Sequence, residues 1–379
     1  MIEEQEDFDI LIIGNSHAYC SFVPEIIDHV LVDTNTLNLS SPNLGVAHAA
    51  ILLRQIIESG NVPEAVVLEV FSVGSDMNDQ LQISFFHDYS KTWQLNNLMW
   101  MSSYYEPQQL LAPLFPLIHQ HENWKQAKLV QENFDNYAER KEKLAAGIAK
   151  DLGYLNDGYR GIPVYMTVNE YNIALKEILP FAPREENILG LERILALSEE
   201  YGFEVIFVQA PYVTGYQSNY SSLHELFTEY DVPYYLLNET HADQYTRFDY
   251  MNPTHLNVHG AIPTTITLAE IMAEEFDRAI DHSTADSFDH LRIEDAIVQR
   301  EGDQVLVTLV PASPSAKWHV QWEFYLWDEH IVAAENGDSL TFSFPASYLE
   351  SSVAHLIITI TQEGLEYPLT FRLQPKNFE

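Results

Sequence analysis

An apolar segment near the N-terminus, Ile10–Ile13, runs directly into Gly14, and a serine, Ser16, follows two residues later. A short, continuous apolar run that ends at a glycine is typical of a strand buried on both faces of a parallel sheet. Open α/β sheets bind their ligands just beyond the carboxyl ends of such strands. We therefore expect an α/β sheet with Ser16 at its ligand-binding edge.

The alternation of strands and helices continues to about residue 280. Further strands are expected at 36–39, 65–70, 204–209 and 233–236, and the helices between them at 46–59, 186–201, 221–230 and 260–280. Five strands joined by helices predict a three-layer α/β/α sandwich with a five-stranded parallel sheet. We assign residues 1–283 to this domain.

Residues 75–184 interrupt the alternation and are too long for one crossover. Their aromatic content and one charged helical stretch predict an inserted, mostly helical cap; the aromatic residues are Phe85, Phe86, Tyr89, Trp93, Trp100, Tyr104, Tyr105 and Trp124. Aromatic side chains often line substrate clefts. The simpler interpretation is that most of these rings pack the cap onto the sheet.

From about residue 284 the hydrophobic pattern changes to a period of two. Strands are expected at 304–310, 318–326, 339–344, 354–360 and 368–373, with turn signals at 335–338 and 362–364. This pattern predicts a small C-terminal β-sandwich over residues 284–379. We expect this accessory domain to brace the first one, since nothing in it marks a glycan-binding face.

The charge balance restricts the partners. The chain has 19 Lys and Arg against 56 Asp and Glu, a formal net charge of -37. Such a surface repels phosphate backbones and anionic membranes, so no nucleic-acid partner is expected. The simplest role of the charge is solubility, and attraction of cationic polymers or metal ions is the alternative.

The chain contains one cysteine, Cys20, so no intramolecular disulfide forms. We expect Cys20 to be a small buried residue, with a nucleophilic role as the alternative because it lies close to Ser16. No apolar stretch reaches the length of about eighteen residues that crosses a membrane. The acidic N-terminus lacks the features of a signal peptide, which favours the cytoplasm, or the cell surface if an anchor has been removed.

A second segment carries a base for Ser16. His255 lies in Asn252–Asn257, after the last short strand and just before the last helix, so the topology brings it to the edge of the sheet where Ser16 lies. A serine hydroxyl becomes a nucleophile when a histidine accepts its proton as it attacks. The backbone N–H of Ser16 would then face the developing oxyanion.

These two segments resemble the first and last blocks of the SGNH/GDSL hydrolase superfamily. Gly14-Asn15-Ser16-His17 is similar to the first block, and Asn252–Asn257 followed by Gly260-Ala261 is similar to the Asp-x-x-His block. The resemblance is closest to bacterial SGNH-like proteins associated with O-acetylation of cell-surface polysaccharides. It implies an SGNH-type fold, a serine nucleophile at position 16 and a histidine base at position 255.

The chain departs from the family pattern at three places. Asn252 stands where the pattern has the orienting aspartate; Asp249 could replace it, or the site could act as a Ser-His dyad. The family pattern places the oxyanion-hole glycine at position 43, which is Asn43 in this chain, and Gly45 is the alternative. No Gly-x-Asn-Asp block, which supplies the oxyanion-hole asparagine in the family pattern, follows the third strand. Asn78 is the nearest asparagine, but it lies further along the chain than the pattern requires.

Two further residues are expected beside the substrate. His17 follows the nucleophile directly, and Tyr212 begins a tyrosine-rich loop at the end of the fourth strand. Both can also have structural roles only. A metal site at His255 and His259, spaced i and i+4, is a minor alternative because the glutamate of a zinc-protease helix is missing.

Together these features predict a serine-dependent O-acyl (acetyl) esterase or O-acyltransferase that acts on carbohydrate through an acyl-enzyme. We expect no cofactor and no metal, an acylated small molecule or carbohydrate as substrate, and envelope-modifying proteins as potential partners. The alternative is a weak or inactive SGNH-like protein that binds polysaccharide as a scaffold.

Overall fold

The computed structural model describes residues 8–40, 44–58, 60–74, 166, 168–176, 182–213, 220–240, 244–315, 317–326, 329–350, 355–363 and 365–373. Five parallel strands form the central sheet in the order β2-β1-β3-β4-β5. They are β1 (Ile10–Ile13), β2 (Thr36–Asn38), β3 (Ala65–Glu69), β4 (Glu204–Gln209) and β5 (Tyr234–Leu236). The mixed α/β class and the five-stranded parallel sheet are confirmed.

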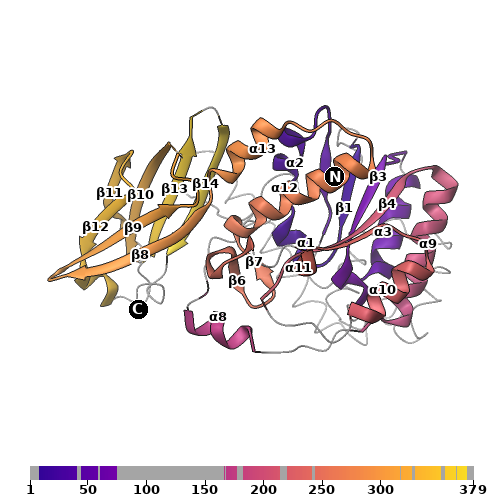
Figure 1. Cartoon of the computed structure of the whole chain (residues 1–379), viewed down its shortest axis with the longest axis horizontal. Helices are drawn as coiled ribbons and strands as arrows, with labels where there is room; N and C mark the ends of the chain where they lie inside the picture. The colour runs from indigo at the N-terminus through magenta and orange to yellow at the C-terminus, as the bar shows by residue number, and fades with distance from the viewer. Residues whose placement is uncertain are drawn as a thin grey trace, which may run out of the picture.

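Helices lie on both faces of this sheet (Figure 1). Alternate residues of β1 enter different hydrophobic clusters: Ile10 and Ile12 join one, and Leu11 and Ile13 join the other. The first face is covered by α1 (Ser16–Ser21), α2 (Pro24–Val30) and α12 (Val258–Glu275), and the second by α3 (Val46–Glu58), α9 (Glu185–Tyr201) and α10 (Tyr220–Glu229). Burial on both faces explains why β1 is apolar at every position.

Antiparallel sheets make up the C-terminal part of the chain. One sheet has the order β11-β10-β13-β14 and the other β12-β9-β8. Their strands are β8 (Ile293–Glu301), β9 (Gln304–Pro311), β10 (Trp318–Leu326), β11 (Glu329–Gly337), β12 (Thr341–Pro345), β13 (His355–Gln362) and β14 (Leu365–Leu373). The sheets contact each other through aromatic rings, because Trp322 of β10 stacks on Phe342 of β12 and Phe324 lies against Phe344.

Shorter elements connect these parts. They are η2 (Val70–Gly74), α8 (Val168–Ala174), α11 (Leu237–Thr240), η5 (Arg247–Asp249), β6 (Tyr250–Asn252), β7 (His255–Leu256), α13 (His282–Asp289) and η6 (Ala346–Glu350). Of the expected cap at 75–184, only α8 and a few neighbouring residues belong to the described part. The listed cap aromatics lie outside the described residues.

The structure adds elements that the sequence patterns did not predict. Strands β8 and β11 were missed, and the sequence Glu335–Gly337, taken as a turn signal, is the end of β11. Helix α13 was also missed. It packs on α2 and α12, so the segment after residue 283 still contacts the parallel-sheet part.

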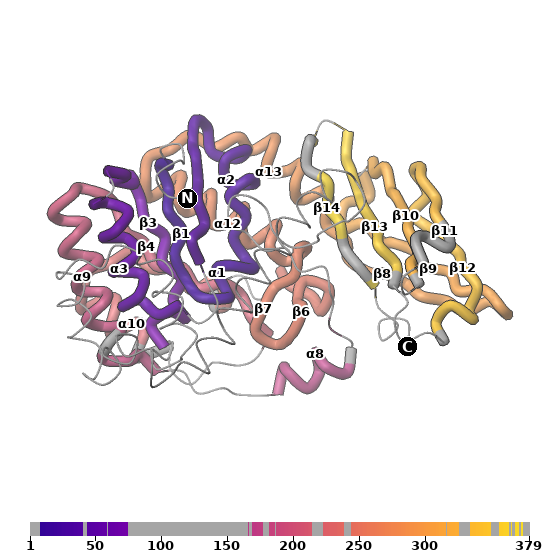
Figure 2. The backbone as a smooth tube through the Cα atoms, turned by 180° about the vertical axis from the view of Figure 1, so that it is seen from behind, coloured from indigo at the N-terminus to yellow at the C-terminus, as the bar shows by residue number. Residues whose placement is uncertain are grey.

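The two parts of the chain lie side by side, with α13 and β14 at their junction (Figures 1 and 2). The indole N–H of Trp318 donates a hydrogen bond of 2.8 Å to the backbone oxygen of His290. One hydrophobic cluster is continuous across the junction.

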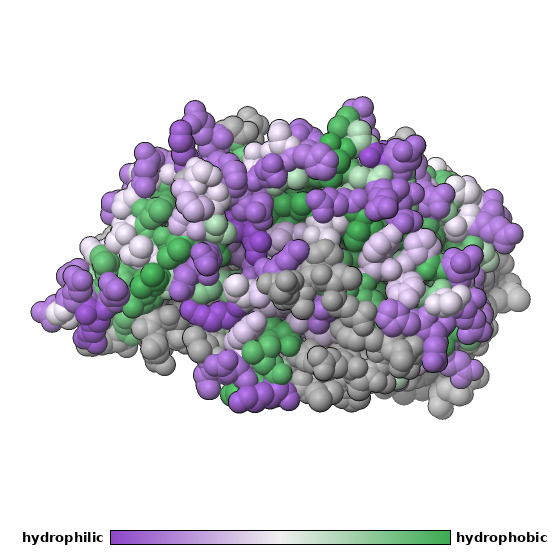
Figure 3. All heavy atoms as spheres, viewed as in Figure 1, coloured by the Kyte–Doolittle hydropathy of each residue, from purple (hydrophilic) through white to green (hydrophobic). Residues whose placement is uncertain are grey.

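The visible surface is rich in hydrophilic side chains, with apolar residues between them (Figure 3). Within the described residues, no helix is both long and apolar enough to cross a lipid bilayer.

Candidate active site

Ser16 lies at the sharp turn between β1 and α1. The Asn15 side chain caps α1 by accepting a hydrogen bond of 2.9 Å from the His17 N–H. Ser16 is therefore the first residue of the helix, and its N–H has no acceptor within the helix. A Cβ at Gly14 would lie 2.5 Å from the Cβ of Glu69, so only glycine allows β1 to approach β3 this closely before the turn.

His255 is held by a two-stranded hairpin, β6 and β7. Asn252 Oδ1 accepts hydrogen bonds from the backbone N–H groups of Thr254, at 2.9 Å, and His255, at 3.0 Å. This side-chain turn reverses the chain between the two short strands. The Asn252 side chain therefore holds the backbone of His255 and also contacts its ring.

Ser16 and His255 meet although 239 residues separate them. Ser16 Oγ lies 2.7 Å from His255 Nε2, and His255 Nδ1 lies 3.0 Å from Asn252 Oδ1. Because Asn252 Oδ1 already accepts two backbone N–H groups, the atom facing Nδ1 is an oxygen, and Nδ1 carries the proton. Nε2 is then unprotonated and accepts the hydrogen bond from the serine hydroxyl, which is the arrangement that a general base requires.

Burial changes the protonation of the His255 ring. It lowers the pKa of His255 to about 4, so the imidazole is neutral at pH 7. Asn252 offers the ring an oxygen without a charge, and the Thr254 hydroxyl lies 3.0 Å from the same Nδ1. The site therefore has a base in the correct tautomer, but one that holds a proton weakly.

His17 forms part of a stack of rings at the site. Its ring lies between Phe71, at a centroid distance of 4.2 Å, and His255, at 4.8 Å. Tyr212 packs edge-on against Phe71 at 4.9 Å, and it is buried rather than open to a ligand. Tyr212 therefore supports the stack through Phe71.

Asp249 does not take the place beside the base. Its carboxylate accepts hydrogen bonds from the N–H and hydroxyl of Thr246 and lies 3.8 Å from Arg292. The local reason is a capping box at the start of η5, which uses the carboxylate for the backbone of Thr246. The expectation that Asp249 could orient His255 is corrected: Asn252 holds that position.

The proposed oxyanion residues are only partly described. Asn43 and Asn78 lie outside the described residues. Gly45 precedes α3 and packs closely against the Asn187 side chain of α9. Among the described residues, no hydrogen bond joins the Gly45 N–H to Ser16, so its role as an oxyanion donor stays a prediction.

The alternative chemistries find little support in the geometry. Cys20 is buried on α1, and both ring nitrogens of His255 are used by Ser16 and Asn252. His259 is fully buried in α12. In the described ranges no group of three or more His, Cys, Asp or Glu side chains could hold a metal ion.

Glu69 is a buried carboxyl next to the site. It ends β3 beneath Gly14, and burial raises its pKa to about 8. Backbone amides of Phe71, Ser72 and Ala210 partly oppose this rise, but neither carboxylate oxygen has a hydrogen bond of ordinary geometry to a described residue. Glu69 is therefore protonated at neutral pH.

Sequence reasoning missed Phe71 and Thr254 as parts of the site. Phe71 follows the third strand directly, in Glu69-Val70-Phe71-Ser72, where the family pattern would have its third block. Its position at the carboxyl end of a strand was the available signal. Nothing in the sequence distinguished the Thr254 hydroxyl from that of an ordinary turn residue.

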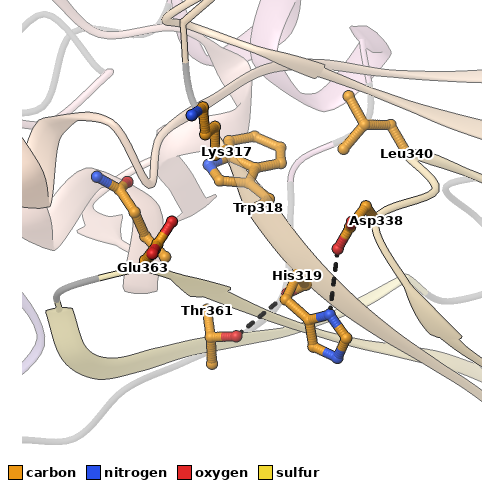
Figure 4. A pocket seen from close by; sticks show the side chains of 8 residues that line it. Lys317, Trp318, His319, Asp338, Leu340, Thr361 and Glu363 are labelled. Carbon is orange, nitrogen blue, oxygen red and sulfur yellow. Dashed lines mark hydrogen bonds and ion pairs between the residues drawn. The ribbon is translucent and has the colours of Figure 1, made fainter.

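A separate hollow lies in the C-terminal part, at the ends of β10 and β13 (Figure 4). It has a volume of about 510 Å³, and its lining includes Lys317, Trp318, His319, Asp338 and Thr361. His319 pairs with Asp338 at 3.3 Å, and both side chains are exposed. None of its lining residues in the described part of the chain is a serine or cysteine, so these residues offer no nucleophile comparable to Ser16.

Comparison with known protein families and with curated proteins gives no match.

Replacing Asn252 by aspartate should strengthen the base. The carboxylate would occupy the position of the amide, 3.0 Å from Nδ1, and would favour the imidazolium. We expect Asn252→Asp to raise kcat for p-nitrophenyl acetate at pH 7 by about tenfold. In the pH–rate profile, the acid limb of Asn252→Asp should lie at higher pH than that of the wild type, because burial lowers the pKa of His255 in the wild type to about 4. A pH–rate profile measures both, and an unchanged profile would show that His255 does not act as the base.

Proposed function

We propose that this protein is a serine-dependent O-acyl esterase or O-acyltransferase that acts on carbohydrate. The observation that supports this proposal most strongly is the hydrogen-bonded series Ser16–His255–Asn252, with distances of 2.7 Å and 3.0 Å. A serine hydroxyl bound to the unprotonated nitrogen of a neutral imidazole is the ground state of nucleophilic acyl transfer.

In the proposed reaction, Ser16 Oγ attacks the acyl carbonyl carbon while its proton passes to His255 Nε2. The imidazolium then gives this proton to the leaving alcohol, and the acyl group remains on Ser16. Water or a sugar hydroxyl next attacks the acyl-enzyme and transfers its proton to His255. When the bond to Ser16 Oγ breaks, this proton returns to the serine.

The oxyanion would be held by backbone N–H groups. The Ser16 N–H at the start of α1 is one donor in this proposal, and the turn that contains Asn43 and Gly45 supplies a second. Two N–H donors without the asparagine side chain of the family pattern would give a weaker oxyanion hole. We therefore expect a slower enzyme than one with the complete set.

The resemblance to the SGNH/GDSL superfamily is part of this proposal. We propose that the parallel sheet and its two helical layers form an SGNH-type three-layer sandwich, and that the two antiparallel sheets form a β-sandwich. The turn after β1 and the hairpin before α12 support this assignment, since they bring Ser16 and His255 to one edge of the sheet. Envelope-modifying proteins would be partners under the same proposal.

A second function, polysaccharide binding without catalysis, is favoured by one specific observation. Asn252 gives the imidazolium no charged partner, so an essential step of acyl transfer is poorly stabilised. In this case the same residues would bind an acylated sugar as part of a scaffold.

Labelling with a fluorophosphonate separates the two functions, because the reagent requires an activated serine. We expect the wild type to be labelled at Ser16, with loss of labelling in Ser16→Ala and His255→Ala. Ser287→Ala is the matched control, since the Ser287 hydroxyl only bonds the backbone of α13. A folded wild type that stays unlabelled, as measured by intact mass, would favour the scaffold function.

A further inference from the structure

The ring of His17 carries its proton on a defined nitrogen. Asn15 Oδ1 accepts the backbone N–H of His17 at 2.9 Å, so this atom must be the amide oxygen. His17 Nδ1 lies 2.9 Å from the same oxygen and therefore has to be the donor. In the neutral ring, Nε2 is then an acceptor without a proton.

This acceptor is held rigidly beside the base. The His17 ring is parallel to His255 within 9° and to Phe71 within 20°. Only 8% of the residue is exposed. Burial and the neighbouring His255 lower the pKa of His17 well below its usual value, so the ring stays neutral.

His17 Nε2 has no hydrogen-bond partner among the described residues, although it is buried. A buried polar atom without a partner is uncommon because leaving it unpaired is costly. The ring that carries this nitrogen stacks on His255, whose Nε2 lies 2.7 Å from Ser16 Oγ, and Ser16 is partly exposed.

We propose that His17 Nε2 accepts a hydrogen bond from a hydroxyl of the substrate, adjacent to the hydroxyl that takes part in acyl transfer. The inference rests on the proposed function and specifies its substrate class: a vicinal diol, as carbohydrates present, rather than a simple alcohol. His17 is then a specificity residue on the alcohol side.

The acyl group of an ester offers His17 Nε2 no hydrogen-bond donor. The carbonyl oxygen and the oxyanion of an ester are acceptors only, and a bare imidazole nitrogen repels them. A hydroxyl is the hydrogen-bond donor that a carbohydrate ester brings to the site.

The two hydroxyls have different roles in the proposed transfer. The His17 and His255 rings are neighbours in the stack, with centroids 4.8 Å apart, so one hydroxyl is assigned to each ring. The hydroxyl at His255 gives its proton to Nε2, and its oxygen attacks the acyl carbon of acyl-Ser16. The bond to Ser16 Oγ breaks, and His255 returns the proton to that oxygen. The hydroxyl at His17 keeps its proton throughout.

A ¹⁵N NMR titration tests the binding step without any turnover. The wild type, with histidine labelled and no ester present, is titrated with propane-1,2-diol and with propan-1-ol. The His17 resonances are assigned by their loss in His17→Gln. We expect the unprotonated Nε2 signal of His17 to shift saturably with the diol, at about fivefold lower concentration than with the mono-alcohol. A protonated Nε2, or no difference between the two alcohols, would overturn the inference.

A transfer assay tests the specificity. With p-nitrophenyl acetate as acyl donor, the ratio of diol ester to propyl ester is measured within each variant, so changes in overall rate cancel. We expect the wild-type ratio to fall about fivefold in His17→Phe, which keeps a ring in the stack, and to recover partly in His17→Gln. A ratio unchanged in His17→Phe would refute the role of His17. Selective diol binding with no acyl transfer would instead refute the proposed function alone.

Discussion

Ser16→Ala is expected to lower kcat/KM for p-nitrophenyl acetate by about 10³-fold or more. The Ser16 hydroxyl lies 2.7 Å from His255 Nε2, and in the proposed reaction no acyl-enzyme can form without this hydroxyl. His255→Ala should cost about the same, since an unassisted hydroxyl is a poor nucleophile at neutral pH. Release of p-nitrophenolate by purified, folded variants measures both effects.

The double variant Ser16→Ala/His255→Ala should be no slower than either single variant, because the two residues act as one unit. Ser287→Ala controls for the loss of a hydroxyl elsewhere. If Ser16→Ala kept most of the activity while Cys20→Ala lost it, the nucleophile would be the thiol. A wild type no faster than its variants would return the question to the scaffold function.

The positions of Ser16 and His255 could be predicted because backbone topology alone determines them. Parallel strands place their carboxyl ends at one edge, and each residue follows a short apolar strand or precedes a helix. The apolar run Ile10–Ile13 carried this information because burial on both faces leaves no ambiguity about the strand.

The choice between Asn252 and Asp249 could not be predicted from spacing. Each side chain has nearby backbone N–H groups to satisfy, and these local bonds decide its orientation. Asn252 accepts the N–H groups of the turn that carries His255, whereas Asp249 caps η5. A carboxylate that appears available in sequence is already used by its neighbours.

The ring stack was hidden for a different reason. His17, Phe71 and His255 come from three separate segments at one edge of the sheet, and side-chain packing decides that their rings stack on one another. Strand β8 was missed because its burial does not alternate strictly, and β11 was missed because it ends in a turn-like sequence. A period-two pattern detects strands that bury one face, and edge strands such as β8 and β11 often depart from this pattern.

Glu69→Gln is expected to stabilise the protein at alkaline pH. Burial raises the pKa of Glu69 to about 8 in the folded state, against about 4.5 in the unfolded chain. Between these values the unfolded state loses the proton and the folded state keeps it. The stability associated with the neutral carboxyl is therefore complete below pH 4.5 and is lost progressively as the pH rises to 8.

The glutamine amide is neutral at every pH and has nearly the same size as the carboxyl group, so Glu69→Gln does not lose stability as the pH rises. The free energy of unfolding of Glu69→Gln relative to wild type should rise by about 1.4 kcal/mol per pH unit, or roughly 4 kcal/mol between pH 5 and pH 8. Urea unfolding at a series of pH values measures the difference. Glu301→Gln, at an exposed site on β8, is the matched control and should leave the pH dependence unchanged.

The direction of the difference is the decisive result, because a carboxylate held by the amides of Phe71, Ser72 and Ala210 would behave in the opposite way. Those amides would lower the pKa of Glu69 if they bound it well, and Glu69→Gln would then destabilise the protein at neutral pH and above. In the structure they do not form hydrogen bonds of ordinary geometry with it. A stabilising substitution at pH 8 that becomes neutral at pH 5 would therefore identify Glu69 as a protonated acid beneath the Gly14 turn.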